Sequence, residues 1–583
     1  MKLLLIVAVV LAIRLPFLNQ AVQGDDVYYL AEAEHAQIEP LHPTHFKLVY
    51  LGNLSDMRGH SHPPMNAWIL GGLLAVFGDI REAPFHAAYI LFSLLAAVAM
   101  WSLAKRFSPN PLWATLLFLA VPAFVINGNS FETDLPFLAF WMSSVALFVS
   151  GRRIASAVTM GLAALTAYQA IFLTPILWLY LWLFDRKRRA AWLIALTPVL
   201  TVVAYQIFER ASTGAVPAAV LTGYFKQYGF QNFDAKLRSA LGLTIHACWL
   251  IFPALLPAAA ILAWRDRHDR RVMFLAGWIA LFFAGALAVF FAGSARYLLP
   301  MAAPVALLAS SLRKRWLAIG VEVQMAVALA LATVNYQHWA AYRPFAASLP
   351  AKDHRIWINA DWGLRYYLEA EGGLPLQRNQ SVRPGDIVVT AELGYPIEFT
   401  TGGGKLAPLA QMEVRPNLPL RLIGLNSRSG YSNVDHGFLP FDISNQPVDR
   451  VRAEEIVKRE PTREDLPMNA PEAQEQIVSG VYAREDGNAW RWTSGRAVIL
   501  LKKPEKPKPL RVSLYIHDNA PARKVTVLLD GIQVAQQQYP GPGRYVLQSA
   551  PVTGSVVTIV ADKTFSVPGD SRELGLILSE VGF

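Results

Sequence analysis

The sequence contains very little cysteine and comparatively little charge. Cys248 is the only cysteine among 583 residues, so the chain can form neither an internal disulfide nor a metal site built from thiolates. Charged residues make up 16% of the sequence, below the roughly 25% that is typical of soluble domains. Hydrophobic residues make up 54%, and the mean hydropathy is +0.30. This composition predicts that much of the chain lies in lipid.

Long apolar runs occur before residue 335 and are nearly absent after it. A membrane-spanning helix needs about 20 mostly apolar residues, within a range of about 17 to 25. The first run has the charged start and short apolar core of a signal peptide, but no clear cleavage site follows it, so we expect a retained helix. The predicted spans are residues 2–18, 85–104, 111–126, 134–150, 154–168, 170–184, 190–208, 246–264, 272–292, 297–312 and 316–334.

Basic residues fall in short clusters between these spans, and cytoplasmic loops carry an excess of Lys and Arg. All clusters reach the cytoplasmic side if the N-terminus is cytoplasmic and residues 65–78 form an interfacial helix instead of a span. The clusters are Lys105 and Arg106, Arg152 and Arg153, Arg186 to Arg189, Arg265 to Arg271, and Arg313 to Arg315. The net charge of +10 therefore reflects membrane topology, and we expect no nucleic-acid partner.

Four carboxylates recur at the outer ends of the predicted spans. Asp25 and Asp26 follow the first span, while Glu132 and Asp134 lie at the start of a later one. Each acid by itself is equally well explained by helix capping or by an ordinary charge at a helix N-terminus. Carboxylates at a membrane edge are costly to desolvate, so their recurrence at one level of one face favours a functional site.

Two histidines, His60 and His62, lie in the first outer loop before a Pro-Pro pair. Their spacing suits a metal or a phosphate, and a pair of solvated loop histidines explains it equally well. Together with Asp25 and Glu132 they could hold a divalent cation, although the sequence requires no cofactor.

The order of three short motifs resembles a known class of membrane enzymes. The motifs are DDVYY at 25–29, HPP at 62–64 and DLP at 134–136. Over roughly residues 1–335 they resemble the GT-C class of membrane glycosyltransferases, most closely bacterial glycosyltransferase family 39 and the aminoarabinose-transferase-like proteins. In such enzymes the acidic pair is more often Asp-Glu. An Asp-Asp pair is also similar to the arabinosyltransferase branch, so the resemblance does not decide whether the transferred sugar is a hexose or a pentose.

The resemblance implies a multi-pass enzyme of the bacterial cytoplasmic membrane, surrounded by membrane lipids. It would transfer a sugar from a polyprenyl-phosphate donor to an acceptor hydroxyl at the outer, periplasmic face. Its match to the first acid of the motif makes Asp25 the expected general base. Asp26, Glu132 and Asp134 would position the acceptor and the base or hold a divalent cation. The acceptor could be an envelope lipid, a glycan or a protein.

The departing phosphate of such a donor requires positive charge at the same level. Arg296 lies at an outer helix end, where a guanidinium can bind phosphate oxygens, and snorkelling to lipid headgroups explains it equally well. His62 is a further candidate for donor binding. Lys226 and Arg238 are also candidates, but for these two loop cations simple contact with lipid is favoured.

The pattern changes after residue 335. Residues 340–430 alternate strand and helix signals and predict an outer-face α/β domain without a G-x-G-x-x-G phosphate motif. Residues 431–489 predict an irregular connector. Residues 490–583 carry short alternating apolar runs and the hairpin signal Asp530-Gly531, which predict a β-sandwich of jelly-roll type without a clear aromatic platform. The predicted fold class is therefore a polytopic α-helical membrane domain, residues 1–335, followed by these two outer domains.

Two other functions fit the same sequence. A polytopic lipid or solute transporter or flippase, with an outer glycan-binding domain, would keep ionisable groups near the middle of the membrane and show inverted repeats. The acids of this chain lie instead at the outer ends of helices. A non-catalytic envelope scaffold would leave the clustered acids without a role.

Overall fold

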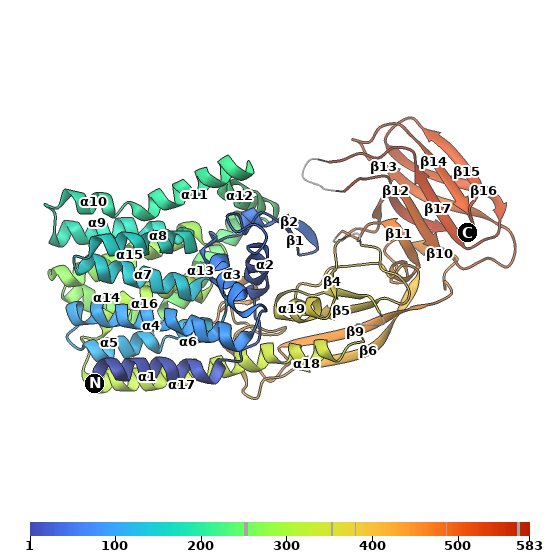
Figure 1. Cartoon of the computed structure of the whole chain (residues 1–583). Helices are drawn as coiled ribbons and strands as arrows, with labels where there is room; N and C mark the ends of the chain where they lie inside the picture. Colours follow the sequence, from blue (N-terminus) through green and yellow to red (C-terminus); the bar gives the residue numbers. More distant parts are fainter. Residues whose placement is uncertain (250–254, 351–353, 379, 486, 568–571) are drawn as a thin grey trace. The chain divides into compact units, whose positions relative to one another are not determined.

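The computed structural model of the protein describes residues 1–249, 255–350, 354–378, 380–485, 487–567 and 572–583 (Figure 1). The chain divides into two compact units. The helical unit comprises Met1–Leu48, Asp56–Pro344 and Glu413–Asp449, and the β-rich unit comprises Val49–Ser55, Phe345–Met412 and Arg450–Phe583. Each unit is described by itself.

The helical unit is a bundle of apolar helices whose axes run roughly parallel in Figure 1, with α2 lying across one end. Neighbouring helices pack in the pairs α1 with α4, α4 with α7, α7 with α8, α15 with α16, and α17 with α5. The helices are α1 Lys2–Arg14, α2 Asp26–His35, α3 Met65–Phe77, α4 Glu82–Phe107, α5 Pro111–Leu119, α6 Pro122–Asn127, α7 Asp134–Val149, α8 Arg153–Thr166, α9 Leu173–Phe184, α10 Arg189–Ile194, α11 Thr197–Thr213, α12 Pro217–Gln227, α13 Phe233–Trp249, α14 Leu255–Arg265, α15 Arg270–Val289, α16 Leu299–Ala309, α17 Lys314–Ala340 and α18 Tyr342–Ala347.

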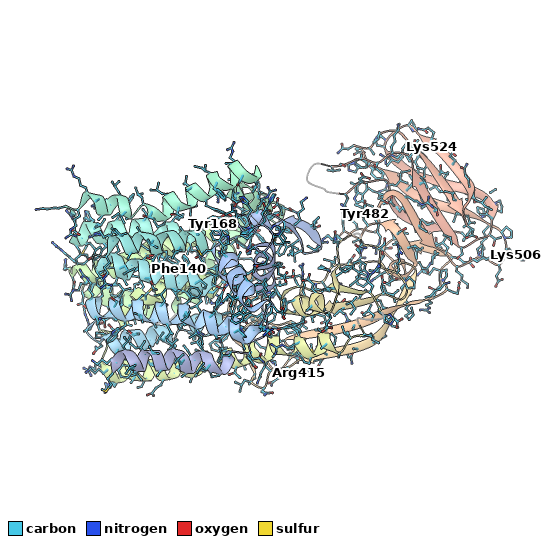
Figure 2. All side chains as sticks on the ribbon, viewed as in Figure 1. Phe140, Tyr168, Arg415, Tyr482, Lys506 and Lys524 are labelled. Carbon is cyan, nitrogen blue, oxygen red and sulfur yellow. The ribbon has the colours of Figure 1, made fainter. Side chains whose placement is uncertain are left out.

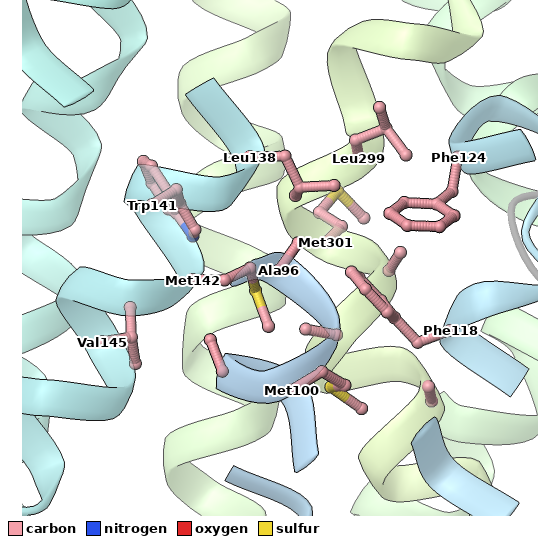
Figure 3. Close-up of a cluster of buried hydrophobic side chains, with 14 of the residues drawn as sticks. Ala96, Met100, Phe118, Phe124, Leu138, Trp141, Met142, Val145, Leu299 and Met301 are labelled. Carbon is pink, nitrogen blue, oxygen red and sulfur yellow. The ribbon is translucent and has the colours of Figure 1, made fainter. Parts of the chain in front are cut away.

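The core of the bundle is apolar and closely packed. Met100 of α4, Phe118 of α5, Trp141 of α7 and Met301 of α16 are fully buried and meet in one cluster (Figure 3). Phe140 of α7 also lies among the helices in Figure 2. Because lipid is as apolar as these side chains, close van der Waals packing holds such helices together.

The predicted polytopic helical fold is confirmed, but fewer helices are long than the predicted spans suggest. Among the described residues, Glu82–Phe107, Arg270–Val289 and Lys314–Ala347 are long and apolar enough to cross a membrane, and several apolar helices are shorter. The predicted span 111–126 is divided into α5 and α6 because Pro122 cannot continue the hydrogen-bond pattern of a helix. The predicted span 246–264 lies partly outside the described residues. Of residues 65–78, predicted as an interfacial helix, Met65–Phe77 form the short helix α3.

The loops with basic clusters gather at one end of the bundle. Arg153, the first residue of α8, pairs with Asp185, after α9, at 2.6 Å. Arg106 of α4 donates to the Tyr180 hydroxyl at 2.9 Å. The hydroxyls of Ser108 and Ser310, after α4 and α16, are 2.6 Å apart. The starts of α2 and α7 lie at the opposite end of the bundle.

The β-rich unit begins with an α/β sheet of strand order β4-β3-β5-β9-β6. Its parallel strands are β3 Ile356–Asn359, β4 Leu374–Pro375 and β5 Ile387–Ala391, and helix α19 Trp362–Ala370 connects β3 to β4. Strand β9 Asp449–Lys458 is antiparallel to β5, and β6 spans Gly404–Val414. Strand β9 comes from the residues that were predicted as a connector, so the α/β sheet draws on a longer part of the chain than 340–430.

The C-terminal part is a nine-stranded sheet of order β15-β14-β17-β12-β18-β13-β16, with β10 beside β18 and β11 beside β12. It begins at Asp465, within the predicted connector and before the predicted boundary at residue 490. The predicted hairpin at Asp530-Gly531 joins β14 to β15, and both residues have positive φ, as a tight hairpin turn requires. The strands are β10 Asp465–Pro467, β11 Ile477–Val481, β12 Arg491–Leu500, β13 Lys508–Ile516, β14 Arg523–Leu529, β15 Ile532–Tyr539, β16 Gly543–Val552, β17 Val556–Ala561 and β18 Ile577–Gly582.

One part of the tail returns to the helical unit. Residues Glu413–Asp449 form β7 Leu420–Arg421, the short helix η5 Val434–His436 and β8 Asp442–Ile443, and they are grouped with the bundle. This return loop separates strands β6 and β9 in sequence. This return was not predicted, because it depends on contacts with distant residues such as Ser294 and Asn127.

Candidate active site

Three carboxylates from two separate parts of the sequence surround one guanidinium. Arg296 contacts Glu132 in an ion pair, Asp25 Oδ2 at 3.5 Å and Asp134 Oδ2 at 3.8 Å. The side chains of Glu132, Asp134 and Arg296 are largely buried, whereas that of Asp25 is 40% exposed. Asp25 is thus the member of this group, here called the acid cluster, that a second molecule can reach most easily.

Local structure places Asp25, Asp134 and Arg296 at the starts of helices, and Glu132 in the loop two residues before α7. Asp25 precedes α2, Asp134 is the first residue of α7, and Arg296 lies in the turn η4 Ala295–Leu298 directly before α16. The partial positive charge of a helix N-terminus favours the two aspartates there. Capping does not explain Asp25, because its side chain makes no capping hydrogen bond with α2.

Gly24 allows the first and second outer loops to approach each other. Its φ is +46°, and a Cβ atom at this position would lie 3.0 Å from Glu132 Oε1. A larger residue would therefore be strained and would press on a carboxylate of the acid cluster.

Asp26 has a different environment from its neighbour. It is fully buried, and its two carboxylate oxygens accept hydrogen bonds from the backbone N–H of Gln23 at 3.0 Å and of Phe131 at 2.7 Å. Burial holds the pKa of the Asp26 carboxyl well above its usual value, against the opposing effect of these two hydrogen bonds. Asp26 therefore ties the first outer loop to the second, and its oxygens are not accessible to a substrate.

His60 and His62 lie next to the acid cluster but in contrasting surroundings. His60 Nδ1 is 2.7 Å from Glu32 Oε1. Burial lowers the pKa of His60, but the charge and the hydrogen bond of Glu32 outweigh it, so the net shift is upward. Burial, His60 and Arg296 together hold the pKa of His62 well below its usual value. His62 Nδ1 lies 3.3 Å from Thr133 Oγ1, between Glu132 and Asp134 in the sequence.

The structure does not bring the other two predicted donor-binding cations into contact with Arg296. Lys226 is exposed near the end of α12. Arg238 of α13 is exposed and lies 3.7 Å from Asp435 of the return loop. Within the described ranges, no group of three or more His, Cys, Asp or Glu side chains is arranged to hold a metal ion. The set of Asp25, Glu132, His60 and His62 is thus not gathered as a metal site.

The loop that carries Glu132 is held by buried polar side chains that sequence analysis did not single out. Fully buried Arg14 of α1 donates to the carbonyls of Phe124 and Val125, both at 2.6 Å. Asn66 of α3 donates to the carbonyl of Phe131 at 2.7 Å and accepts from the Tyr89 hydroxyl at 2.7 Å. A polar residue in an apolar run was the available signal for Arg14, since such residues usually have a partner inside the bundle.

The return loop is bound to the turn that carries Arg296. The carbonyl of Tyr431 accepts from Ser294 Oγ at 2.8 Å and from the Ala295 N–H at 3.2 Å. The Tyr431 hydroxyl donates at 2.6 Å to Oδ1 of Asn127, the last residue of α6, directly before the loop that carries Glu132. Burial, followed by the charge of Asp134, raises the pKa of Tyr431. Tyr431 thus links the two segments that meet in the acid cluster.

One family model matches part of the helical unit. Residues 61–208 match the family model of dolichyl-phosphate-mannose-protein mannosyltransferases. The matched stretch contains His62, Glu132 and Asp134, whereas Asp25 and Arg296 lie outside it. The resemblance to GT-C class membrane glycosyltransferases, predicted from the three motifs, is confirmed. A search of curated proteins finds no match.

Three solved structures are partly similar to this chain. ArnT from Cupriavidus metallidurans, bound to undecaprenyl phosphate, is 14% identical at a TM-score of 0.46, covering 77% of this chain and 97% of that one. The arabinofuranosyltransferase AftD from Mycobacteria is 13% identical at a TM-score of 0.37, and the match covers 100% of this chain and 58% of AftD. The arabinosyltransferase EmbB from Mycobacterium smegmatis is 14% identical at a TM-score of 0.27, and the match covers 99% of this chain and 64% of EmbB. At these values the likeness carries no functional conclusion.

Proposed function

We propose that the protein is a glycosyltransferase that moves a sugar from a polyprenyl-phosphate donor to an acceptor hydroxyl at the outer face of the bacterial cytoplasmic membrane. The observation that carries the proposal is the convergence of Asp25, Glu132 and Asp134 on Arg296. The match of residues 61–208 to a family of lipid-phosphate-sugar transferases supports it.

Asp25 is the general base in this proposal because it is the most exposed carboxylate of the acid cluster. It takes the proton of the acceptor hydroxyl while that oxygen forms a bond to C1 of the sugar. The bond between C1 and the phosphate oxygen breaks, and the lipid phosphate leaves with the electron pair. A correctly placed base contributes about 10² to 10⁴-fold to the rate of such a step.

Arg296 binds the leaving phosphate in this proposal. A guanidinium presents several N–H donors to phosphate oxygens and carries a permanent charge, which matches the charge that develops on the leaving group. His62, close to Arg296, adds a ring nitrogen beside the same position. Glu132 and Asp134 hold Arg296 in place, and Asp26 positions Asp25 through its bonds to both outer loops. Lys226 and Arg238 are left to contact lipid phosphates farther from the acid cluster.

The location of the acid cluster favours transfer over transport. It lies at the end of the bundle opposite the basic clusters, which cytoplasmic loops normally carry. Gln324, a polar residue inside the apolar run of α17, donates to the Leu117 carbonyl at 3.0 Å and so has a structural role. A donor whose tail lies in lipid presents its reactive carbon at the membrane boundary, where Asp25 lies.

The test is a transfer assay with the purified chain in liposomes. Undecaprenyl phosphate carrying radiolabelled mannose, glucose or arabinose is incubated with envelope lipids, glycans and proteins as acceptors, with and without a chelator. We expect transfer from one donor, and we expect Asp25→Asn to lower kcat by about 10² to 10⁴-fold. Asp79→Asn, at an exposed loop carboxylate, is the matched control and should keep full activity.

Two outcomes contradict the proposal. Transfer from none of the donors would remove the proposed function, and undiminished transfer by a folded Asp25→Asn variant would remove the role of Asp25. Thermal unfolding of each variant shows whether it is folded.

A further inference from the structure

The C-terminal sheet carries a cleft of about 1050 Å³ on its outer face. Its lining combines aromatic rings with charged and polar groups, among them Glu485, Trp490, Trp492, Tyr515, His517 and Arg544. Ligand pockets for small molecules typically measure about 300 to 1,000 Å³. The cleft is thus large enough for a ligand of several rings.

Four lining side chains form one row across neighbouring strands. Trp492 of β12 is paired with Ile577 of β18, Ile577 with Tyr515 of β13, and Tyr515 with Arg544 of β16. Directly paired residues point to the same side of a sheet, with Cβ atoms about 4.5 to 5.5 Å apart. The row therefore presents two rings, an aliphatic side chain and a cation on a continuous surface.

The row faces away from the main core of the sheet. On β13, Val512, Leu514 and Ile516 are buried in that core, so the intervening Ser513 and Tyr515 point to the other side. The outward rings form a second cluster in which the rings of Trp490 and Trp492 are 6.0 Å apart and perpendicular. Tyr482, labelled in Figure 2, packs at its margin. Trp490 and Tyr515 remain half-buried, with part of each ring accessible.

Polar groups lie among these rings. The Tyr515 hydroxyl donates to Asp518 at 2.9 Å, and Glu485 pairs with Arg572 at 2.8 Å. Arg544 is exposed and has no ion-pair partner among the residues that the structure describes. Glu485, Tyr515 and Arg544 thus place donors and acceptors beside the aromatic faces of the cleft.

Other ligand classes fit this lining less well. Arg544 is the one cation among the lining residues that the structure describes, whereas nucleic acid needs a continuous basic surface. A lipid tail would leave the charged groups without partners. A peptide strand adds to a free sheet edge, but this cleft lies across the face of paired strands.

We propose that this cleft binds a saccharide chain. A sugar ring has faces of C–H bonds, which suit the accessible faces of Trp490 and Tyr515, and a rim of hydroxyls, which suits Glu485, His517 and Arg544. The unpaired charge of Arg544 favours a carboxylate or another anionic substituent at that end. This site is independent of the proposed transfer reaction, because none of its residues belongs to the acid cluster.

The experiment is calorimetric titration of the full chain in detergent with maltohexaose, mannohexaose, arabinohexaose and hexagalacturonic acid. We expect saturable binding of at least one oligosaccharide, weakened at least tenfold by Trp490→Ala and by Tyr515→Ala. Arg544→Ala should weaken hexagalacturonic acid more than a neutral oligosaccharide. The controls Arg511→Ala, on the same face of β13, and Tyr395→Ala, an exposed tyrosine of the β-rich unit, should bind as the unaltered chain does.

The outcomes separate this proposal from the proposed transfer. Asp25→Asn should bind the oligosaccharide normally. Binding of none of the four sugars at millimolar concentration overturns the saccharide site, as does binding that folded Trp490→Ala and Tyr515→Ala variants retain in full. Neither result bears on the transfer assay.

Discussion

Asp25 and Asp26 are neighbours in sequence but differ in what they can do. Asp25 is partly exposed and faces Arg296, whereas Asp26 is fully buried and accepts two backbone hydrogen bonds. A side chain that changes protonation during a reaction has to reach the substrate. Asp25 can therefore react with a substrate, whereas Asp26 positions Asp25.

The two histidines of the first outer loop should respond to pH with opposite sign. The pKa of His60 is raised in the fold, so its contribution to stability is full below the unfolded value of about 6.5 and is lost as the pH rises through the folded value. The pKa of His62 is lowered, so the unfolded chain takes up a proton at this ring before the folded protein does. The folded protein therefore loses stability as the pH falls below about 6.5.

Melting temperatures of two variants measure this difference. We expect His60→Gln to destabilise the protein more at pH 6 than at pH 9, relative to the unaltered chain. We expect His62→Gln to be comparatively more stable at pH 6 than at pH 9. An equal change at both pH values for His60→Gln would show that its pairing with Glu32 does not contribute through charge.

The sequence indicated the acids of the site but not the residues that hold them. Asp25, Glu132, Asp134 and Arg296 were singled out because charge at the end of an apolar run is a local and unusual feature. Nothing local distinguishes Asn66 or Tyr431, whose roles depend on partners 65 and 304 positions away in the sequence. Such contacts are decided only when the helices pack.

At the scale of elements, the break between α5 and α6 shapes the site. The predicted span 111–126 is interrupted before Pro122, and the carbonyls at the end of α6 lack the N–H donors that a continuing helix would supply, although that of Phe124 accepts from the Gly128 N–H at 3.3 Å. Arg14 of α1 satisfies the carbonyls of Phe124 and Val125 and also contacts Ser93 Oγ at 2.9 Å. One side chain thus joins α1, α4 and α6 beneath the loop that carries Glu132.

Removing this side chain should destabilise the bundle. We expect Arg14→Met to lower the free energy of unfolding by about 2 to 4 kcal/mol, since each buried acceptor left without a donor costs about 1 to 3 kcal/mol. Transfer activity should fall as well, because the loop from 127 to 133 loses its support. Thermal unfolding in detergent measures the effect, and Arg81→Met, at an exposed arginine before α4, is the control. Equal melting of the two variants would contradict the role of Arg14.

At the scale of the whole molecule, basic clusters and the acid cluster lie at opposite ends of the helical unit. The basic clusters meet at one end, as the contacts of Arg106 and Arg153 show, and the acid cluster lies at the other. Because Lys and Arg are retained on the cytoplasmic side, this division predicts a cytoplasmic N-terminus and an outer acid cluster.

Cysteine labelling tests this orientation in cells. In a Cys248→Ser background, a cysteine is introduced by Arg188→Cys in a basic cluster or by Arg511→Cys in the C-terminal sheet, both exposed positions. We expect a membrane-impermeant maleimide to label only Arg511→Cys in intact spheroplasts and both variants after permeabilisation. Labelling of Arg188→Cys in intact spheroplasts would reverse the proposed orientation.

By itself, the sequence determined the helical membrane fold, the positions of the charge clusters and the acids at the helix ends. These features follow from local composition, because the partition of a segment between lipid and water depends on its own side chains. Only the tertiary structure decided that Asp25 and Asp26 have different environments, that the return loop binds beside Arg296, and that rings from β12 and β13 meet across β18. These features depend on pairing between distant segments, and the physical reason is that packing and strand register, which place such side chains together, are properties of the folded chain as a whole.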